Sequence, residues 1–218
     1  MSRPRKETVT CPQCGKQTDI IIWDTLNAEM NPTEKQQLLD GSLFRFVCEC
    51  GYTAGIDAGM LYHNMTRHAM VYYVSEESVE QTEEMFADIR KHSEFEMADY
   101  KYRIVTTQNA LREKAIILEN DLDDRVIELV KLFYYVHIHD EQPEVDTKEV
   151  LFFTDNGKWL LQFIGSTSMT AELSTDFYKK VRDQFSDRLA EAGDEELHID
   201  SRWAMSFLGY GVEYKCQT

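Results

Sequence analysis

Short runs of apolar and β-branched residues near the N-terminus are typical of β-strands. Residues 8–23 contain two such runs on either side of a Cys-Pro-Gln-Cys-Gly turn, and residues 43–47 contain another. Between them, Asn31-Pro32 opens a short helix that Gly41 can end. The pattern therefore predicts two hairpin-like segments separated by an inserted helix.

Helical spacing becomes clearer in the middle of the chain. Strands are predicted over residues 70–74 and 103–108, and an acidic helix over residues 79–90. The clearest helix spans residues 121–137, where apolar side chains recur every three or four positions. Asp121 is its predicted N-cap, because a carboxylate there can accept N–H bonds from the first turn.

A polar segment at about residues 140–148 has the composition of a linker. After it, two predicted strands over residues 150–154 and 158–164 flank Asn156-Gly157. Asn-Gly is a strong signal for a tight hairpin turn, because both residues accept positive φ. A β-hairpin is therefore expected here.

A further helix is predicted around residues 177–189, where apolar residues recur every four positions. Ser174 or Thr175 can cap its N-terminus. Residues 197–199 and 204–214 are predicted to return as strands. The last third of the chain is therefore expected to form a small α+β unit.

The 218-residue chain has a net charge of −16, and residues 76–145 alone hold 18 acidic and 8 basic side chains. Phosphate backbones are bound by clustered Lys and Arg, so nucleic-acid and anionic-membrane partners are disfavoured. No stretch approaches the roughly 20 apolar residues that span a bilayer, and the polar start lacks the apolar segment of a signal peptide. We therefore expect a cytoplasmic protein with a protein partner.

The cysteines carry the strongest chemical signal. Cys11 and Cys14 lie in the Cys-Pro-Gln-Cys-Gly turn, and Cys48 and Cys50 form a second close pair. In a reducing compartment such pairs favour metal ligands over disulfides, and Zn²⁺ takes four ligands in a tetrahedron. We predict that these four cysteines bind Zn²⁺. A redox pair at Cys11 and Cys14 is the alternative, but the region lacks a βαβ pattern.

The second pair is one residue shorter than a Cys-x-x-Cys knuckle. The identity of the fourth ligand is therefore open. Gly51 gives the backbone the freedom to turn after Cys50, so Cys48 and Cys50 can both reach one ion. His63 and Cys216 are the alternative ligands. Cys216 would have to close a much longer loop, which costs more entropy.

These motifs resemble the CpXC domain family, which is bacterial and archaeal and is named for paired Cys-Pro-x-Cys motifs. The resemblance covers about residues 8–135 and implies a four-cysteine site without implying a reaction. Cys48-Glu49-Cys50 departs from the family pattern because it lacks the proline and is one residue shorter. The segments that carry the resemblance are Cys11-Pro-Gln-Cys14-Gly15, Asn31-Pro32, Leu38-Leu39-Asp40-Gly41-Ser42-Leu43-Phe44, Leu61-Tyr62-His63-Asn64, Leu111-Arg112-Glu113-Lys114 and Leu122-Asp123-Asp124-Arg125.

We therefore expect an α+β fold. It would begin with a zinc-ribbon-like β module with an inserted helix at residues 8–75, followed by mixed α/β segments. A CpXC-like domain would span residues 1–145, and a small α+β extension residues 146–218. The predicted function is that of a structural zinc-binding module in a cytoplasmic binding or adaptor protein.

Histidines suggest the alternative, a metal-assisted hydrolase that uses His63 or the pair His137 and His139. His63 could be a ligand or an acid/base group, but a packed, hydrogen-bonded histidine is the simpler interpretation. On a helix, residues two apart point to nearly opposite sides, so His137 and His139 would not converge. No catalytic residue is predicted.

Overall fold

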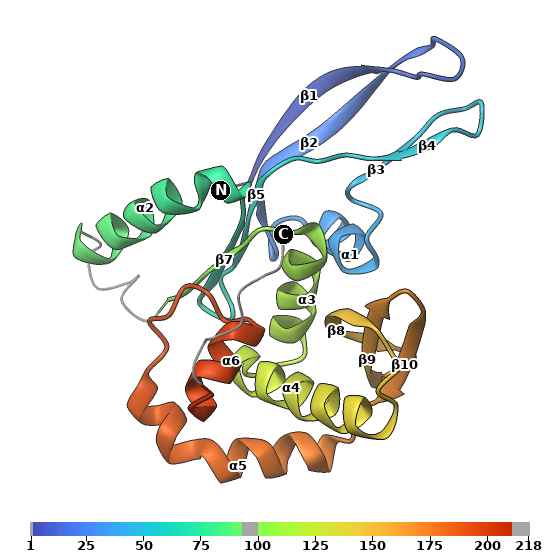
Figure 1. Ribbon diagram of the computed structural model, residues 1–218. Coiled ribbons are helices and arrows are strands. Elements are labelled where there is room, and N and C mark those ends of the chain that lie inside the picture. Colours follow the sequence, from blue (N-terminus) through green and yellow to red (C-terminus); the bar gives the residue numbers. More distant parts are fainter. Residues whose placement is uncertain (1, 93–99, 211–218) are drawn as a thin grey trace. The chain divides into compact units, whose positions relative to one another are not determined.

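Figure 1 shows the computed structural model, which describes residues 2–92 and 100–210. The fold is α+β, as predicted. The chain divides into two compact units, Met1–Ala115 and Ile116–Thr218. The boundary predicted near residue 145 stays a prediction. In the part of the chain that the structure describes, no helix is long and apolar enough to cross a membrane.

The first unit is built on a five-stranded sheet with the order β1-β2-β5-β6-β7. The pairs β1/β2 and β5/β6 are antiparallel, whereas β2/β5 and β6/β7 are parallel. Alternate side chains of β5 and β6 are buried, as expected where one face of a sheet is covered. The strands are β1 (Arg3–Thr10), β2 (Gln17–Asn27), β5 (Met60–Asn64), β6 (Ala69–Tyr73) and β7 (Lys101–Val105).

A separate two-stranded hairpin consists of β3 (Arg45–Val47) and β4 (Thr53–Gly55). In Figure 1 it runs alongside the long β1–β2 hairpin. The predicted inserted helix, α1 (Pro32–Asp40), lies in the chain between the two hairpins. It ends at Gly41, whose φ of 80° is left-handed and favours glycine.

Helices complete the first unit. The 3₁₀-helix η1 (Glu76–Ser78) leads into α2 (Val79–His92), and Phe86 of α2 is fully buried against Tyr102 of β7. The helix α3 (Gln108–Glu119) follows β7, includes the boundary between the two units at Ala115, and was not predicted from the sequence. Its Arg112 side chain donates a hydrogen bond of 2.6 Å to the carbonyl of Leu39 in α1.

Beyond the end of α3, the described residues of the second unit form three helices and a three-stranded antiparallel sheet with the order β10-β9-β8. The predicted Asn156-Gly157 hairpin is confirmed, because both residues have positive φ and Asp155 pairs with Lys158 across the turn. The helix α4 packs against α5, α6 and β8. The elements are α4 (Asp124–Glu141), β8 (Thr147–Asp155), β9 (Lys158–Gly165), β10 (Ser168–Glu172), α5 (Thr175–Ala192) and α6 (Ser201–Leu208).

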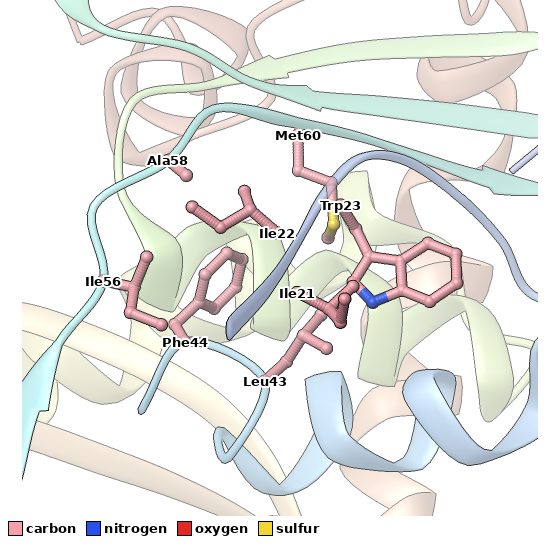
Figure 2. A pocket seen from close by; sticks show the side chains of 8 residues that line it. All are labelled: Ile21, Ile22, Trp23, Leu43, Phe44, Ile56, Ala58 and Met60. Atoms are coloured by element: carbon pink, nitrogen blue, oxygen red, sulfur yellow. The ribbon is translucent and has the colours of Figure 1, made fainter. Parts of the chain in front are cut away.

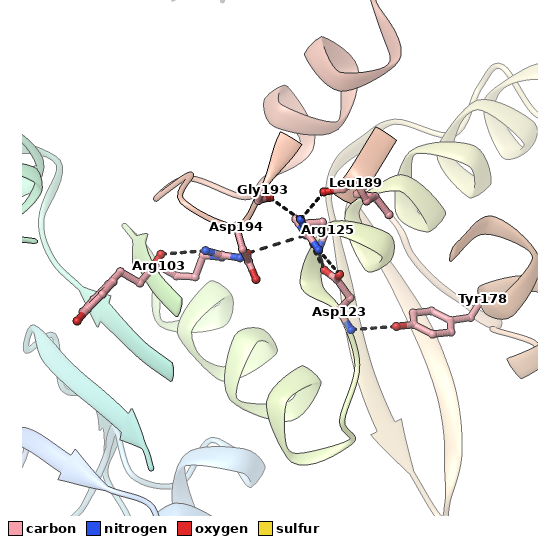
Figure 3. Close-up of polar contacts among 8 residues, drawn as sticks. Arg103, Asp123, Arg125, Tyr178, Leu189, Gly193 and Asp194 are labelled. Carbon is pink, nitrogen blue, oxygen red and sulfur yellow. Dashed lines mark hydrogen bonds and ion pairs between the residues drawn. The ribbon is translucent and has the colours of Figure 1, made fainter. Parts of the chain in front are cut away.

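Arg125 ties the start of α4 to the end of α5 within this unit. Its guanidinium makes a two-pronged contact with Asp123, with Nη2–Oδ2 at 2.7 Å and Nε–Oδ1 at 3.1 Å. It also donates to the carbonyl oxygens of Leu189 and Gly193 (Figure 3). The backbone N–H of Asp123 donates to the Tyr178 hydroxyl at 2.9 Å.

Two predictions in this region are wrong. Asp123, not Asp121, caps α4, because its Oδ1 accepts the Arg125 N–H at 2.9 Å, while Asp121 lies in a turn with a φ of 58°.

The strands predicted over residues 197–199 and 204–214 are the second error. Residues 201–208 form α6, whose N-cap Asp200 accepts the Trp203 N–H, and residues 197–199 form no strand. Residues 211–214 lie outside the described residues. The pattern of this short apolar run is compatible with either a strand or a helix, and the N-cap Asp200 favours the helix.

Candidate metal centre

The four predicted cysteines come from two turns. Cys11 and Cys14 lie between β1 and β2, and Cys48 and Cys50 lie between β3 and β4. All four Sγ atoms lie within 4.8 Å of one another. The cluster therefore brings together two hairpins that are far apart in the sequence.

Corresponding backbone hydrogen bonds close both turns. In the first turn the N–H of Cys11 donates to the carbonyl of Lys16 at 2.9 Å, and in the second the N–H of Cys48 donates to that of Tyr52 at 2.8 Å. The second turn is thus one residue shorter but has the same design. The backbone closes the second turn around one residue fewer, and the thiols of Cys48 and Cys50 both still lie in the cluster.

A left-handed glycine follows each pair. Gly15 has a φ of 74° and donates to the carbonyl of Cys11, and Gly51 has a φ of 89° and donates to that of Cys48. Both N–H···O distances are 2.9 Å. Because a side chain makes positive φ costly, glycine at these positions lets each turn fold back sharply under its thiols.

Burial differs between the two members of each pair. Cys11 and Cys48 are buried, and Cys14 and Cys50 are exposed. The buried thiols form a small core with Phe46, and the partly buried residues packed against this core are Val9, Ile20, Tyr52, Ala54 and Ile56. So few side chains give the paired hairpins little hydrophobic stabilisation of their own.

Local interactions shift the pKa values of the metal-free thiols in opposite directions. Burial acts to raise the pKa of Cys11, but backbone hydrogen bonds from Cys14 and Gln13 outweigh it and lower that pKa to about 7. At Cys50 a backbone hydrogen bond from Tyr52 favours the thiolate, but burial and the neighbouring cysteines raise the pKa to about 12. The cluster therefore keeps protons that a bound cation would displace.

An ion pair that the sequence interpretation missed joins the two turns. Lys16 follows the first pair of cysteines, Glu49 lies inside the second, and Lys16 Nζ contacts Glu49 Oε2. A hydrogen bond to Glu49 raises the pKa of Lys16, and the same contact lowers the pKa of Glu49. The sequence signal for this contact was a lysine just after one cysteine pair and a glutamate within the other.

The donor set fits a tetrahedral ion that prefers sulfur. The Sγ atoms of Cys14 and Cys48 are 3.6 Å apart, and those of Cys11 and Cys50 are 3.7 Å apart. Ligands at about 2.3 Å from a tetrahedral Zn²⁺ lie about 3.8 Å from one another. The cluster could therefore hold an ion of this kind with little movement of the side chains.

The rival ligand His63 and the histidines of the alternative hydrolase lie elsewhere. Among the described residues, the four cysteines form a group that could hold a metal, and His63 does not belong to it. His63 Nε2 is 3.1 Å from the Tyr100 hydroxyl, and burial lowers the histidine's pKa. His137 and His139 are exposed on α4. Cys216 lies outside the described residues.

A pocket in the first unit offers no comparable chemistry. It encloses about 240 Å³ of space that is partly open to solvent (Figure 2). Its lining has no ionisable side chain and consists of Ile21, Ile22, Trp23, Leu43, Phe44, Ile56, Ala58 and Met60. The four-cysteine cluster is therefore the candidate functional site.

Comparison with known proteins agrees with this site. A family model described as "CpXC protein" matches residues 9–131, which confirms the resemblance seen in the sequence. No curated protein and no solved structure matches the chain.

Proposed function

The chain belongs to the CpXC family, and from this premise and the four-cysteine cluster we propose that its N-terminal hairpins form a structural zinc-binding module of a binding or adaptor protein. Cys11, Cys14, Cys48 and Cys50 would hold the ion. The observation that carries the proposal is the convergence of four Sγ atoms within 4.8 Å from two separate turns.

The small core around the cluster supports a structural role for the ion. Two turns that share few buried side chains need another interaction to hold them together. Four thiolates bound to one ion supply it, because the free energy of binding in such sites is largely free energy of folding. The Lys16–Glu49 ion pair is exposed and adds little stability.

A closed ligand set also favours binding over catalysis. Four protein ligands leave no position for a water molecule, which a metal-assisted hydrolase requires. The hydrogen bond of His63 to Tyr100 and the exposed positions of His137 and His139 give that alternative no support. We propose a cytoplasmic setting and, because the net charge of −16 disfavours phosphate backbones, a protein partner.

Metal analysis tests the proposal directly. The protein purified without added metal should carry about one zinc per chain by inductively coupled plasma mass spectrometry. Removal of the zinc by a chelator should increase hydrogen exchange in β1–β4, and added zinc should reverse the change. A metal-free protein with unchanged exchange in these strands would refute the structural role.

A further inference from the structure

Each exposed thiol of the cluster contacts a buried thiol of the other hairpin. Exposed Cys14 has its Sγ 3.6 Å from that of buried Cys48, and exposed Cys50 has its Sγ 3.7 Å from that of buried Cys11. The two short contacts therefore cross between the hairpins. An oxidant from solvent can reach one thiol of each contact, and the second thiol is already beside it.

We propose that Cys14 and Cys50 are oxidation sites, and that hydroperoxides convert the cluster into two disulfides, Cys14–Cys48 and Cys11–Cys50, with release of the metal. This inference rests on the proposed zinc site, because it concerns the same four thiols. The chemical class of the co-reactant is a hydroperoxide, with hydrogen peroxide as its simplest member.

The reaction balances in two steps for each disulfide. First, the thiolate of the exposed cysteine, which the bound ion would keep deprotonated, attacks one peroxide oxygen, the S–O bond forms, the O–O bond breaks, and hydroxide leaves. The sulfur is thereby oxidised by two electrons to a sulfenic acid. Second, the thiolate of the buried partner attacks that sulfur, the disulfide forms, and a second hydroxide leaves. Solvent protons convert both hydroxides to water.

The release of metal follows from the same balance. Two molecules of hydrogen peroxide produce both disulfides and consume all four thiolates. Since the thiolate and not the disulfide is the metal ligand, one ion leaves for every two molecules of peroxide. The hairpins stay joined, because each new bond replaces a link between them that the ion had provided.

The turn geometry favours the crossed pairing over a disulfide inside the second turn. Cys48 and Cys50 are separated by a single residue in a turn closed by the Cys48 N–H to Tyr52 carbonyl bond. A disulfide between them would close a very small ring, and departures from relaxed disulfide geometry make such bonds strained and easily reduced. The crossed pairs start from S···S contacts of 3.6 and 3.7 Å.

Trypsin separates disulfides between the hairpins from disulfides within a turn, and fragmentation of the joined species between its cysteines assigns the individual pairs. Cys11 and Cys14 lie together in the tryptic peptide 7–16, and Cys48 and Cys50 lie together in the peptide 46–67. The full chain carrying Cys216→Ser would be treated with hydrogen peroxide, alkylated, digested and analysed by mass spectrometry. Crossed disulfides join the two peptides into one species, whereas disulfides within the turns leave them separate.

We expect the joined species, together with release of one zinc per two peroxides in a metal-indicator assay and recovery of the separate peptides after reduction. Separate peptides with internal disulfides, sulfinic or sulfonic acids without disulfides, or unmodified thiols would each overturn the inference. Zinc content is measured on the reduced protein first. Absence of zinc there would refute the proposed function, and the peptide pattern with the fragmentation of the joined species would still decide the disulfide pairing independently.

Discussion

The Sγ atom of Cys14 lies 3.6 Å from that of Cys48, although the two residues are 34 positions apart in the chain. Each sits in a turn closed by its own backbone hydrogen bonds. The turns are local structures, but their approach depends on the folding of everything between them, including α1. Occupation of the site is therefore expected to depend on folding, and folding of the hairpins on occupation.

Cys50→Ser should abolish stoichiometric zinc binding, because a hydroxyl group is a poor substitute for a thiolate in a site of four sulfurs. Cys48→Ser should have the same effect. Elemental analysis of the purified variants measures the loss. The rival ligands provide the controls, since Cys216→Ser and His63→Ala should both keep about one zinc per chain. Full retention in Cys50→Ser together with loss in either control would identify a different fourth ligand.

Gly51→Ala should weaken zinc binding about tenfold, because the left-handed conformation costs an alanine about 1–2 kcal/mol. Gly51 has a φ of 89°, and a Cβ atom there would meet nothing within 4 Å, so the effect isolates backbone strain. A competition titration with a chromophoric chelator measures the affinity.

Gly55→Ala is the matched control. Gly55 lies in β4 of the same hairpin without a left-handed φ, and a Cβ atom there would also meet nothing within 4 Å. Its zinc affinity should stay within about twofold of the natural protein. Equal losses in the two variants would argue against a special role of the turn after Cys50.

Zinc affinity should rise steeply with pH. The metal-free cluster retains protons near neutrality, since the pKa of Cys50 is raised to about 12 and that of Cys48 is also raised, while that of Cys11 is about 7. A bound ion needs thiolates, so these protons must leave, and a lower pH opposes their release. Cys48 and Cys50 alone imply an increase of at least about 100-fold per pH unit between pH 6 and 8.

Calorimetry in buffers of different ionisation enthalpy measures the proton release directly. We expect at least about two protons per zinc at pH 7. An affinity that does not change with pH would show that the thiols are already ionised in the metal-free protein.

Much of the fold and the cluster could be predicted because the signals were local. Asn31-Pro32 and Gly41 bound α1, Asn156-Gly157 makes the β8–β9 turn, and the two cysteine pairs lie in turns as expected. These residues act through their own φ angles or through nearest neighbours. The sequence signal for each of these features therefore lies within a few residues of the feature itself.

Features that depend on distant partners could not be predicted in the same way. The α3 helix was missed, and part of what holds it is a hydrogen bond from Arg112 to Leu39, 73 positions away. Likewise, the Lys16–Glu49 contact exists only once the two hairpins meet. The misplaced cap of α4 is a local error instead, because Asp121 and Asp123 are both plausible caps by residue type and only Asp123 accepts the Arg125 N–H in the structure.

The contacts of Arg125 carry the last prediction, for the second unit. Its side chain is 12% exposed, and its guanidinium binds Asp123 through two bonds as well as the carbonyl of Leu189. Burial acts to lower its pKa, but the hydrogen bond and the charge of Asp123 raise it, so the cation is favoured here. Arg125→Gln leaves the carboxylate and the carbonyl without these donors.

Arg125→Gln should therefore lower the free energy of unfolding of this unit by about 2–3 kcal/mol. Arg182→Gln is the control, because the guanidinium of Arg182 bonds to its neighbour Asp183 and both side chains are more than half exposed. Its cost should stay below about 1 kcal/mol. Urea unfolding followed by hydrogen exchange in α4 and α5 compares the two variants, and zinc content should not change in either. If both arginines gave the same small loss, the buried contacts of Arg125 would contribute no more than an exposed ion pair does.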